Sequence, residues 1–170
     1  MQVFRGLPRI PMAATGGCAL TIGNFDGVHR GHQAMLALLT NEARHRGLPS
    51  CVMTFEPHPR DHFALRRGQP ELAPPRIATL RDKLGELERC GIDRVLVMRF
   101  DDRLASQSPE SFIDDTLVRD LGARYVLVGD DFRFGAQRAG TYAMLDEAGT
   151  RAGFDVARMM SYEVHGLRVS

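Results

Sequence analysis

Residues 18–32 read Cys18-Ala19-Leu20-Thr21-Ile22-Gly23-Asn24-Phe25-Asp26-Gly27-Val28-His29-Arg30-Gly31-His32, and this stretch decides the fold. The apolar run Cys18–Ile22 predicts a buried β-strand, and from Gln33 onward the apolar residues fall close to helical spacing. Two glycines, Gly23 and Gly27, lie between the strand and the helix. A strand, a glycine-containing turn and a helix start in this order are typical of α/β proteins that hold phosphate.

His29 and His32 are three residues apart, so they can share one face of the first helical turn. The unpaired N–H groups and the macrodipole at a helix N-terminus favour anions, and two imidazoles add hydrogen-bond donors. Gly31 permits a ligand to approach the backbone closely. The pattern therefore predicts phosphate contact. A purely structural histidine pair is the alternative, and a zinc site would need a third ligand, for which no convincing spacing exists.

Four further runs of strand-forming residues follow Cys18–Ile22 and alternate with helical patterns. The alternation predicts a Rossmann-like, doubly wound parallel sheet of five strands in the order 3-2-1-4-5, with helices on both faces. The four runs are Cys51–Phe55, Arg94–Met98, Tyr125–Val128 and Phe154–Arg158.

Helix boundaries are marked by turn and cap residues. Gly47 ends the first helix, and Ser108 followed by Pro109 is an N-cap with proline at the first helical position. A helix is expected over 77–90, with the charges of residues 79–84 on its surface. Residues 59–75 contain several prolines and a glycine and are expected to form a long connection.

Two more segments follow the carboxyl ends of predicted strands, where ligands bind in open α/β sheets. Pro57 and Pro59 fix the backbone around His58 and give a stiff, partly apolar wall. Phe132 and Phe134 would place their rings on the same side of an extended segment, as core residues or as ligand contacts.

Composition bounds the remaining possibilities. A chain of 170 residues with 44% hydrophobic residues suits one globular domain. Its 22 basic and 21 acidic residues give a net charge of +1, which does not support broad nucleic-acid binding. Three cysteines without metal-like spacing indicate reduced core thiols, and no stretch has the length of a membrane span. We expect a soluble, cytoplasmic protein without membrane partners.

Three ordered motifs resemble those of prokaryotic FAD synthetases, whose FMN adenylyltransferase domains belong to the nucleotidyltransferase superfamily. The first spans residues 23–32. The second, residues 54–59, resembles Thr-Phe-x-Pro-His-Pro, and the third, residues 129–140, resembles Gly-x-Asp-Phe-Arg-Phe-Gly-x-x-Arg-x-Gly. The resemblance implies transfer of AMP from ATP to FMN, which gives FAD and pyrophosphate.

The resemblance also implies roles for individual residues. His29 and His32 would be catalytic, stabilising the phosphates, while Mg²⁺ would arrive with ATP and the protein would supply no metal site. The residues expected to bind ATP are Gly23, Asn24, Phe25, Asp26, His29, Gly31, His32 and Ser170. The residues expected to bind the flavin are Pro57, His58, Pro59, Asp131, Phe132 and Arg133.

The sequence departs from the family at its end. The family continues with a Ser-Ser-Thr-x-x-Arg type motif, and Ser170 resembles the first serine. We therefore expect residues 1–170 to be an FMN adenylyltransferase domain truncated at its C-terminal end, without the riboflavin kinase domain of many relatives, and only weakly active. A non-catalytic flavin or adenine-nucleotide binding domain and a nucleotidyltransferase with another phosphate acceptor remain alternatives, and the oligomeric state is left open.

Overall fold

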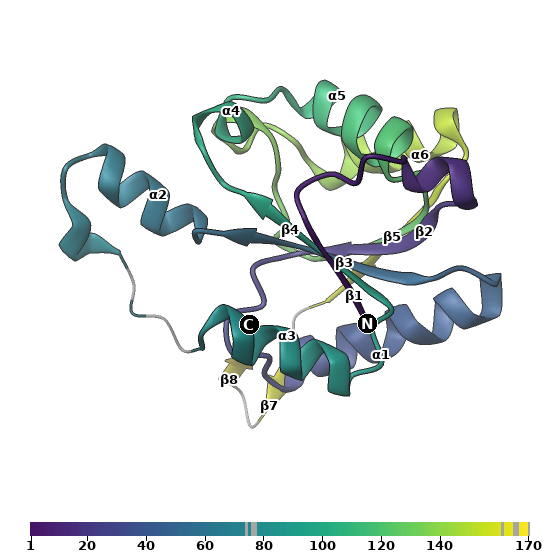
Figure 1. Cartoon of the computed structure of the whole chain (residues 1–170), viewed down its shortest axis with the longest axis horizontal. Coiled ribbons are helices and arrows are strands. Elements are labelled where there is room, and N and C mark those ends of the chain that lie inside the picture. Colours follow the sequence, from purple (N-terminus) through teal and green to yellow (C-terminus); the bar gives the residue numbers. More distant parts are fainter. Residues whose placement is uncertain (74, 76–77, 161, 165–166, 170) are drawn as a thin grey trace.

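A parallel β-sheet forms the centre of the protein (Figure 1). The computed structural model describes residues 1–73, 75, 78–160, 162–164 and 167–169. Within these ranges the sheet has six strands, and every neighbouring pair is parallel. In spatial order they are β1 (Gln2–Arg5), β4 (Arg94–Arg99), β3 (Ser50–Glu56), β2 (Cys18–Ile22), β5 (Ala123–Gly129) and β6 (Asp155–Met159).

Helices cover both faces of the sheet because its strands carry apolar side chains on both sides. One face packs against α1 (Arg30–Arg46) and α3 (Leu80–Arg89), through residues such as Leu39 and Leu87. The opposite face packs against η1 (Met12–Thr15), the π-helix η3 (Phe112–Asp120) and α6 (Tyr142–Ala152). Figure 1 shows these two layers below and above the strands.

The remaining elements are short. They are α2 (Pro59–Arg66), η2 (Pro70–Leu72), α4 (Asp102–Ala105), α5 (Pro109–Ser111), η4 (Ala136–Arg138) and an antiparallel hairpin of β7 (Tyr162–Val164) and β8 (Leu167–Val169). In the part of the chain that the structure describes, no helix is both long enough and apolar enough to cross a bilayer.

The predicted strand order is confirmed. The five predicted strands correspond to β2 to β6 and have the expected order 3-2-1-4-5. The sheet also contains β1, which the sequence analysis did not predict. This strand has four residues and pairs with the outer edge of β4, where Val3 remains 41% exposed, so it lacks the continuous apolar run of a buried strand.

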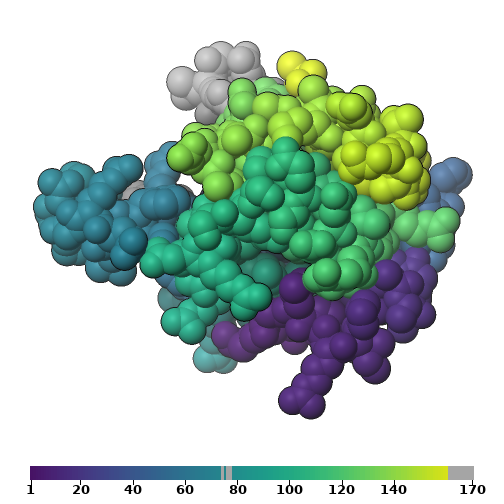
Figure 2. Space-filling view, turned by 90° about the horizontal axis from the view of Figure 1, so that it is seen from above, coloured from purple at the N-terminus to yellow at the C-terminus, as the bar shows by residue number. Residues whose placement is uncertain are grey.

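The prediction of a long connection over 59–75 is wrong, because this segment contains α2 and η2. The ring nitrogen Nδ1 of His58 accepts a hydrogen bond from the backbone N–H of Arg60, and Pro59 occupies the first helical position. Both residues favour a helix start. The segment stands away from the sheet at the side where the strands end, as Figures 1 and 2 show.

Other helix boundaries agree with the sequence. Gly47 has φ +67° at the end of α1, and Ser108 caps α5, with Pro109 at its first position. The helix expected over 77–90 spans Leu80–Arg89, where Thr79 and Asp82 form a reciprocal capping box.

Candidate functional site

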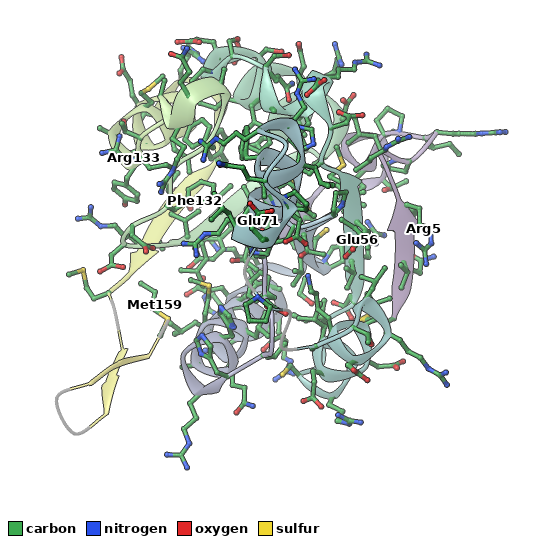
Figure 3. The ribbon with its side chains drawn as sticks, turned by 90° about the vertical axis from the view of Figure 1, so that its left-hand side faces the viewer. Arg5, Glu56, Glu71, Phe132, Arg133 and Met159 are labelled. Carbon is green, nitrogen blue, oxygen red and sulfur yellow. The ribbon has the colours of Figure 1, made fainter. Side chains whose placement is uncertain are left out.

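A cavity of about 550 Å³ lies at the carboxyl ends of the strands. Its walls come from the β2–α1 turn, the β3–α2 turn and the segment after β5, together with residues that follow β4. This position is the one expected for a ligand site in a doubly wound sheet. Figure 3 looks onto this side, with Glu71 of η2 in front and with Phe132 and Glu56 on either side of it.

The polar end of the cavity is built on the N-terminus of α1. Nδ1 of His29 accepts hydrogen bonds from the backbone N–H groups of Gly31, at 3.1 Å, and His32, at 3.4 Å. His29 therefore caps the helix, and two of the N–H groups expected to meet phosphate are hydrogen-bonded to its ring. The rings of His29 and His32 stack at 3.7 Å between centroids, and Phe25 lies 4.9 Å from His32.

Three polar atoms at this end have no hydrogen-bond partner among the described residues although they are buried. They are Oδ1 of Asn24, Nε2 of His29 and Nδ1 of His32. Leaving a buried polar atom unpaired costs about 1–3 kcal/mol, so such atoms are rare in folded proteins. Asn24 and His32 both line the cavity, and a polar ligand there would satisfy them.

His32 is neutral at physiological pH. Its pKa is lowered from 6.5 to about 4. Burial is the largest cause, and the nearby His29 and Lys83 also lower the pKa, while a hydrogen bond to the backbone of Gly27 and the charge of Asp26 raise it. Burial also lowers the pKa of His29. Both imidazoles of the stacked pair are thus neutral, and because Nδ1 of His29 already accepts from the backbone, the proton of that ring is on Nε2, which can only donate.

Lys83 is buried beneath this turn, with only 3% of its surface exposed. The expectation that the charges of residues 79–84 lie on the helix surface is therefore wrong for this residue. Its ammonium donates to Oγ1 of Thr54 at 3.2 Å, and the Thr54 hydroxyl donates to the backbone carbonyl of Asn24 at 3.0 Å.

The opposite end of the cavity is aromatic. Phe55 from β3, Phe63 from α2 and Phe100 after β4 line it, and Phe100 lies 5.8 Å from Phe55 and 5.7 Å from Phe63, edge to face. His62 lies 5.4 Å from both Phe63 and Phe100. Its Nε2 is 3.1 Å from Oδ1 of Asp102, which also pairs with Arg66 at 3.2 Å.

The segment after β5 forms a third wall. Phe132 and Phe134 stack with ring centroids 5.6 Å apart, as expected for rings on the same side of the chain. Phe134 is buried in the core, whereas Phe132 is half-buried and the side chains of Asp131 and Arg133 are exposed (Figure 3). Both rings line the cavity, and the buried Phe134 also belongs to the core.

Most of the predicted site residues meet in this cavity. Nine line it: Gly23, Asn24, Phe25, His32, His58, Pro59, Asp131, Phe132 and Arg133. Four others, Asp26, His29, Gly31 and Pro57, lie in the same turns but do not line the cavity. The carboxylate of Asp26 instead accepts from the backbone N–H of Ala78, at 3.3 Å. Ser170 lies outside the described residues.

Much of the aromatic end was not predicted from the sequence. Phe100 carried a usable signal, because it directly follows β4 and carboxyl-end positions had already been singled out on other strands. Phe63 carried none, because the helix on which it lies was not predicted. Other lining residues that were not assigned to the site include Met35, Phe55, Arg60, Leu104, Gln107 and Arg138.

No group of three or more His, Cys, Asp or Glu side chains that could hold a metal ion occurs in the described ranges. Magnesium bound together with a nucleotide does not need such a group, since it usually keeps several waters and takes its other ligands from phosphates and one or two carboxylates.

Comparison with known proteins gives consistent matches over the whole chain. It is 46% identical over 170 residues to a protein of Escherichia coli K12 named bifunctional riboflavin kinase/FMN adenylyltransferase, covering 100% of this chain and 53% of that one. A protein of Pseudomonas fluorescens with the same name is 47% identical over 173 residues, covering 100% and 52%. The chain therefore spans about half the length of these relatives.

A solved structure shares the fold. A crystal structure described as a macrolide-efflux protein from Streptococcus pneumoniae superposes with a TM-score of 0.80 at 25% identity, over 99% of this chain and 52% of that one. The family model described as FAD synthetase matches residues 12–170, which include all three motifs and the turns that form the cavity. The chain belongs to the FAD synthetase family.

Proposed function

We propose that this chain transfers AMP from ATP to FMN, forming FAD and pyrophosphate, and that it is the adenylyltransferase domain of a bifunctional riboflavin kinase/FAD synthetase. The family and the names of the two relatives support the reaction, and the half-length coverage supports the second domain.

The observation that carries the proposal is the two-ended cavity. One end presents buried polar atoms without described partners, from Asn24 and His32. The other end presents aromatic rings beside His58 and Pro59. Oδ1 of Asn24 can accept from a hydroxyl or amino group of a nucleotide, a ring N–H can donate to a phosphate oxygen, and a planar flavin ring needs flat apolar walls. A single cavity with both surfaces suits a reaction that joins the two substrates.

The chemistry needs alignment more than a base. A phosphate monoester is mostly dianionic near neutral pH, since its second pKa is about 6, so the FMN phosphate can attack the α-phosphorus of ATP directly. A new P–O bond forms as the bond to pyrophosphate breaks. Holding the two reactants in line is worth about 7–11 kcal/mol. Neutral His32 can meet phosphate oxygens only through its single ring N–H, and Asn24 only through its amide N–H groups, because Oδ1 of Asn24 accepts.

His29 acts indirectly, by supporting His32 and the turn. Because its Nδ1 caps α1, its ring holds the turn and supports His32 by stacking. Gly23 and Phe25 give the β2–α1 turn the shape that ATP requires. Asp26 and Gly31 contribute through the backbone of this turn. The flavin contacts come from cavity-lining residues of two segments, and Pro57 fixes the β3–α2 turn. These contacts are His58, Pro59, Asp131, Phe132 and Arg133. Ser170 is proposed to bind ATP, and only its resemblance to the family motif supports this role.

Magnesium would arrive with ATP, held by phosphate oxygens and water molecules, and would neutralise charge on the phosphates. The partners are thus ATP and FMN, without nucleic acid or membrane. We place the reaction in the cytoplasm, because Cys18, Cys51 and Cys90 are free thiols.

The test is formation of FAD from FMN, ATP and Mg²⁺, followed by chromatography with stoichiometric detection of pyrophosphate. We expect both products to appear together, and none with an ATP analogue whose α,β-bridge is not cleavable. His32→Ala should reduce the rate far more than it reduces FMN affinity. FMN binding without FAD would favour the non-catalytic flavin-binding module, and turnover with another phosphate acceptor only would favour a different transferase.

A further inference from the structure

Lys83 is a charged side chain buried inside the protein, and the proposed chemistry gives it no role. It is the one charged residue in the buried core of the described chain. Lysine is almost never fully buried without a specific interaction, because removing its ammonium from water costs several kcal/mol.

Packing alone does not explain a lysine here. Leu80, Leu84 and Leu87 pack on the same face of α3 as Lys83, toward the sheet. An apolar side chain of similar length would fill this position without the desolvation cost, and such replacements of buried charges are often neutral or stabilising. The reason for an ammonium at this position must therefore lie in the groups that it contacts.

Its contacts lead directly to the cavity. An ammonium can only donate, so the Thr54 hydroxyl accepts from Lys83 and must use its own proton for the Asn24 carbonyl. This fixes the direction of both hydrogen bonds. The chain of contacts joins α3, the carboxyl end of β3 and the first residues of the β2–α1 turn, three segments that are distant in sequence.

Asn24 is the residue at which this chain of contacts ends, and its side-chain Oδ1 is one of the buried atoms without a described partner. The backbone of Asn24 is thus held in place while its side chain is left for a ligand. The charge of Lys83 also acts on His32, the other cavity residue with such an atom.

We propose that Lys83 is a positioning residue for the nucleotide: through the Thr54 hydroxyl it fixes the Asn24 turn against which the ATP phosphates bind. The inference rests on the proposed function, since it assigns the polar end of the cavity to ATP. Its effect is confined to that end, because neither Lys83 nor Thr54 lines the aromatic end.

The test is a double-mutant cycle with Lys83→Met and Thr54→Val, measured by ATP binding, by FMN binding and by FAD formation. Each single variant should lower kcat/KM for ATP roughly 10- to 100-fold, the loss typical of a displaced binding group. FMN affinity should stay within about twofold, which also shows that the variant has folded. The double variant should lose no more kcat/KM for ATP than the more strongly impaired single variant, since both changes interrupt one chain of contacts.

Arg81→Met is the matched control, because Arg81 lies two residues away on the same helix and is exposed. It should behave as the unmodified chain. Equal losses of ATP and FMN affinity would assign Lys83 a general structural role and overturn the inference, as would additive losses in the double variant. ATP binding is also measured in the absence of FMN, so the role of Lys83 is tested even if no FAD forms. Failure of the proposed reaction is recognised separately, because the unmodified chain would then form no FAD.

Discussion

His32 is the residue where the location of the site and its electrostatics are most closely linked. Its ring lines the cavity, stacks on His29 and lies within the field of Lys83 and Asp26. Burial is the largest reason that its pKa falls to about 4. The same burial that positions the ring for hydrogen bonding therefore also keeps it uncharged at neutral pH.

This depressed pKa makes the stability of the protein depend on pH. Between pH 6.5 and about 4, His32 takes up a proton in the unfolded chain but not in the folded one, so the free energy of unfolding falls as pH falls through this window. His32→Gln should remove a decrease on the order of 2 kcal/mol between pH 7 and pH 4. Urea unfolding followed by circular dichroism measures it, since the chain has no tryptophan.

The control is His45→Gln, an exposed histidine near the other end of α1. It should leave the pH profile as in the unmodified chain. Identical profiles for the unmodified chain and His32→Gln would contradict the assignment of a depressed pKa to His32.

At the scale of elements, α2 differs from the other helices of eight or more residues because it buries less of itself. Only Ala64 is buried, and the helix is held by the ring contacts of His62 and Phe63 and by the pairs of His62 and Arg66 with Asp102. These contacts all lie at the aromatic end of the cavity or next to it. The position of α2 and the shape of that end thus depend on each other.

Phe63→Ala should therefore weaken FMN binding and spare ATP. Stacking of a planar heterocycle on an aromatic side chain is worth about 1–3 kcal/mol, so we expect the dissociation constant of FMN to rise roughly tenfold or more. Quenching of flavin fluorescence measures it. Leu65→Ala, on the same helix and 65% exposed, is the control and should have no effect. A comparable change in ATP affinity would show that the two ends are not separate.

Prediction from sequence succeeded where an element buries apolar residues in a regular pattern. The strands β2 to β5 do so, and their alternation with helices indicated a parallel sheet, while the order was the one expected for a doubly wound fold. The helix α2 does not, because its contacts come from rings supplied by other elements, although His58 and Pro59 carried a cap signal. Lys83 was misplaced because residue type was given more weight than spacing, since it lies on the apolar stripe with Leu80, Leu84 and Leu87.

At the scale of the whole molecule, the site joins segments that are far apart in the chain. The turns after β2, β3 and β5 meet because those strands are neighbours in one sheet (Figure 1), and α2 contributes Phe63 to the aromatic end. Sequence motifs could identify which turns meet, because parallel strands end at the same edge. They could not show which side chains of a turn face the cavity, as Pro57 and His29 illustrate, because that depends on the packing around them.

A ligand held by several elements should stabilise the fold as a unit. FMN at about 100 times its dissociation constant stabilises the folded state by about 2.7 kcal/mol, which for a domain of this size raises Tm by roughly 5–10 °C. Calorimetry at increasing FMN measures the shift, which should grow with the logarithm of concentration. Riboflavin at equal concentration tests how much of this stabilisation comes from the FMN phosphate. It should shift Tm less, because it lacks the phosphate that contacts the polar end of the cavity. Equal shifts for the two would mean that the flavin phosphate makes no contact in the cavity and would contradict the two-ended arrangement.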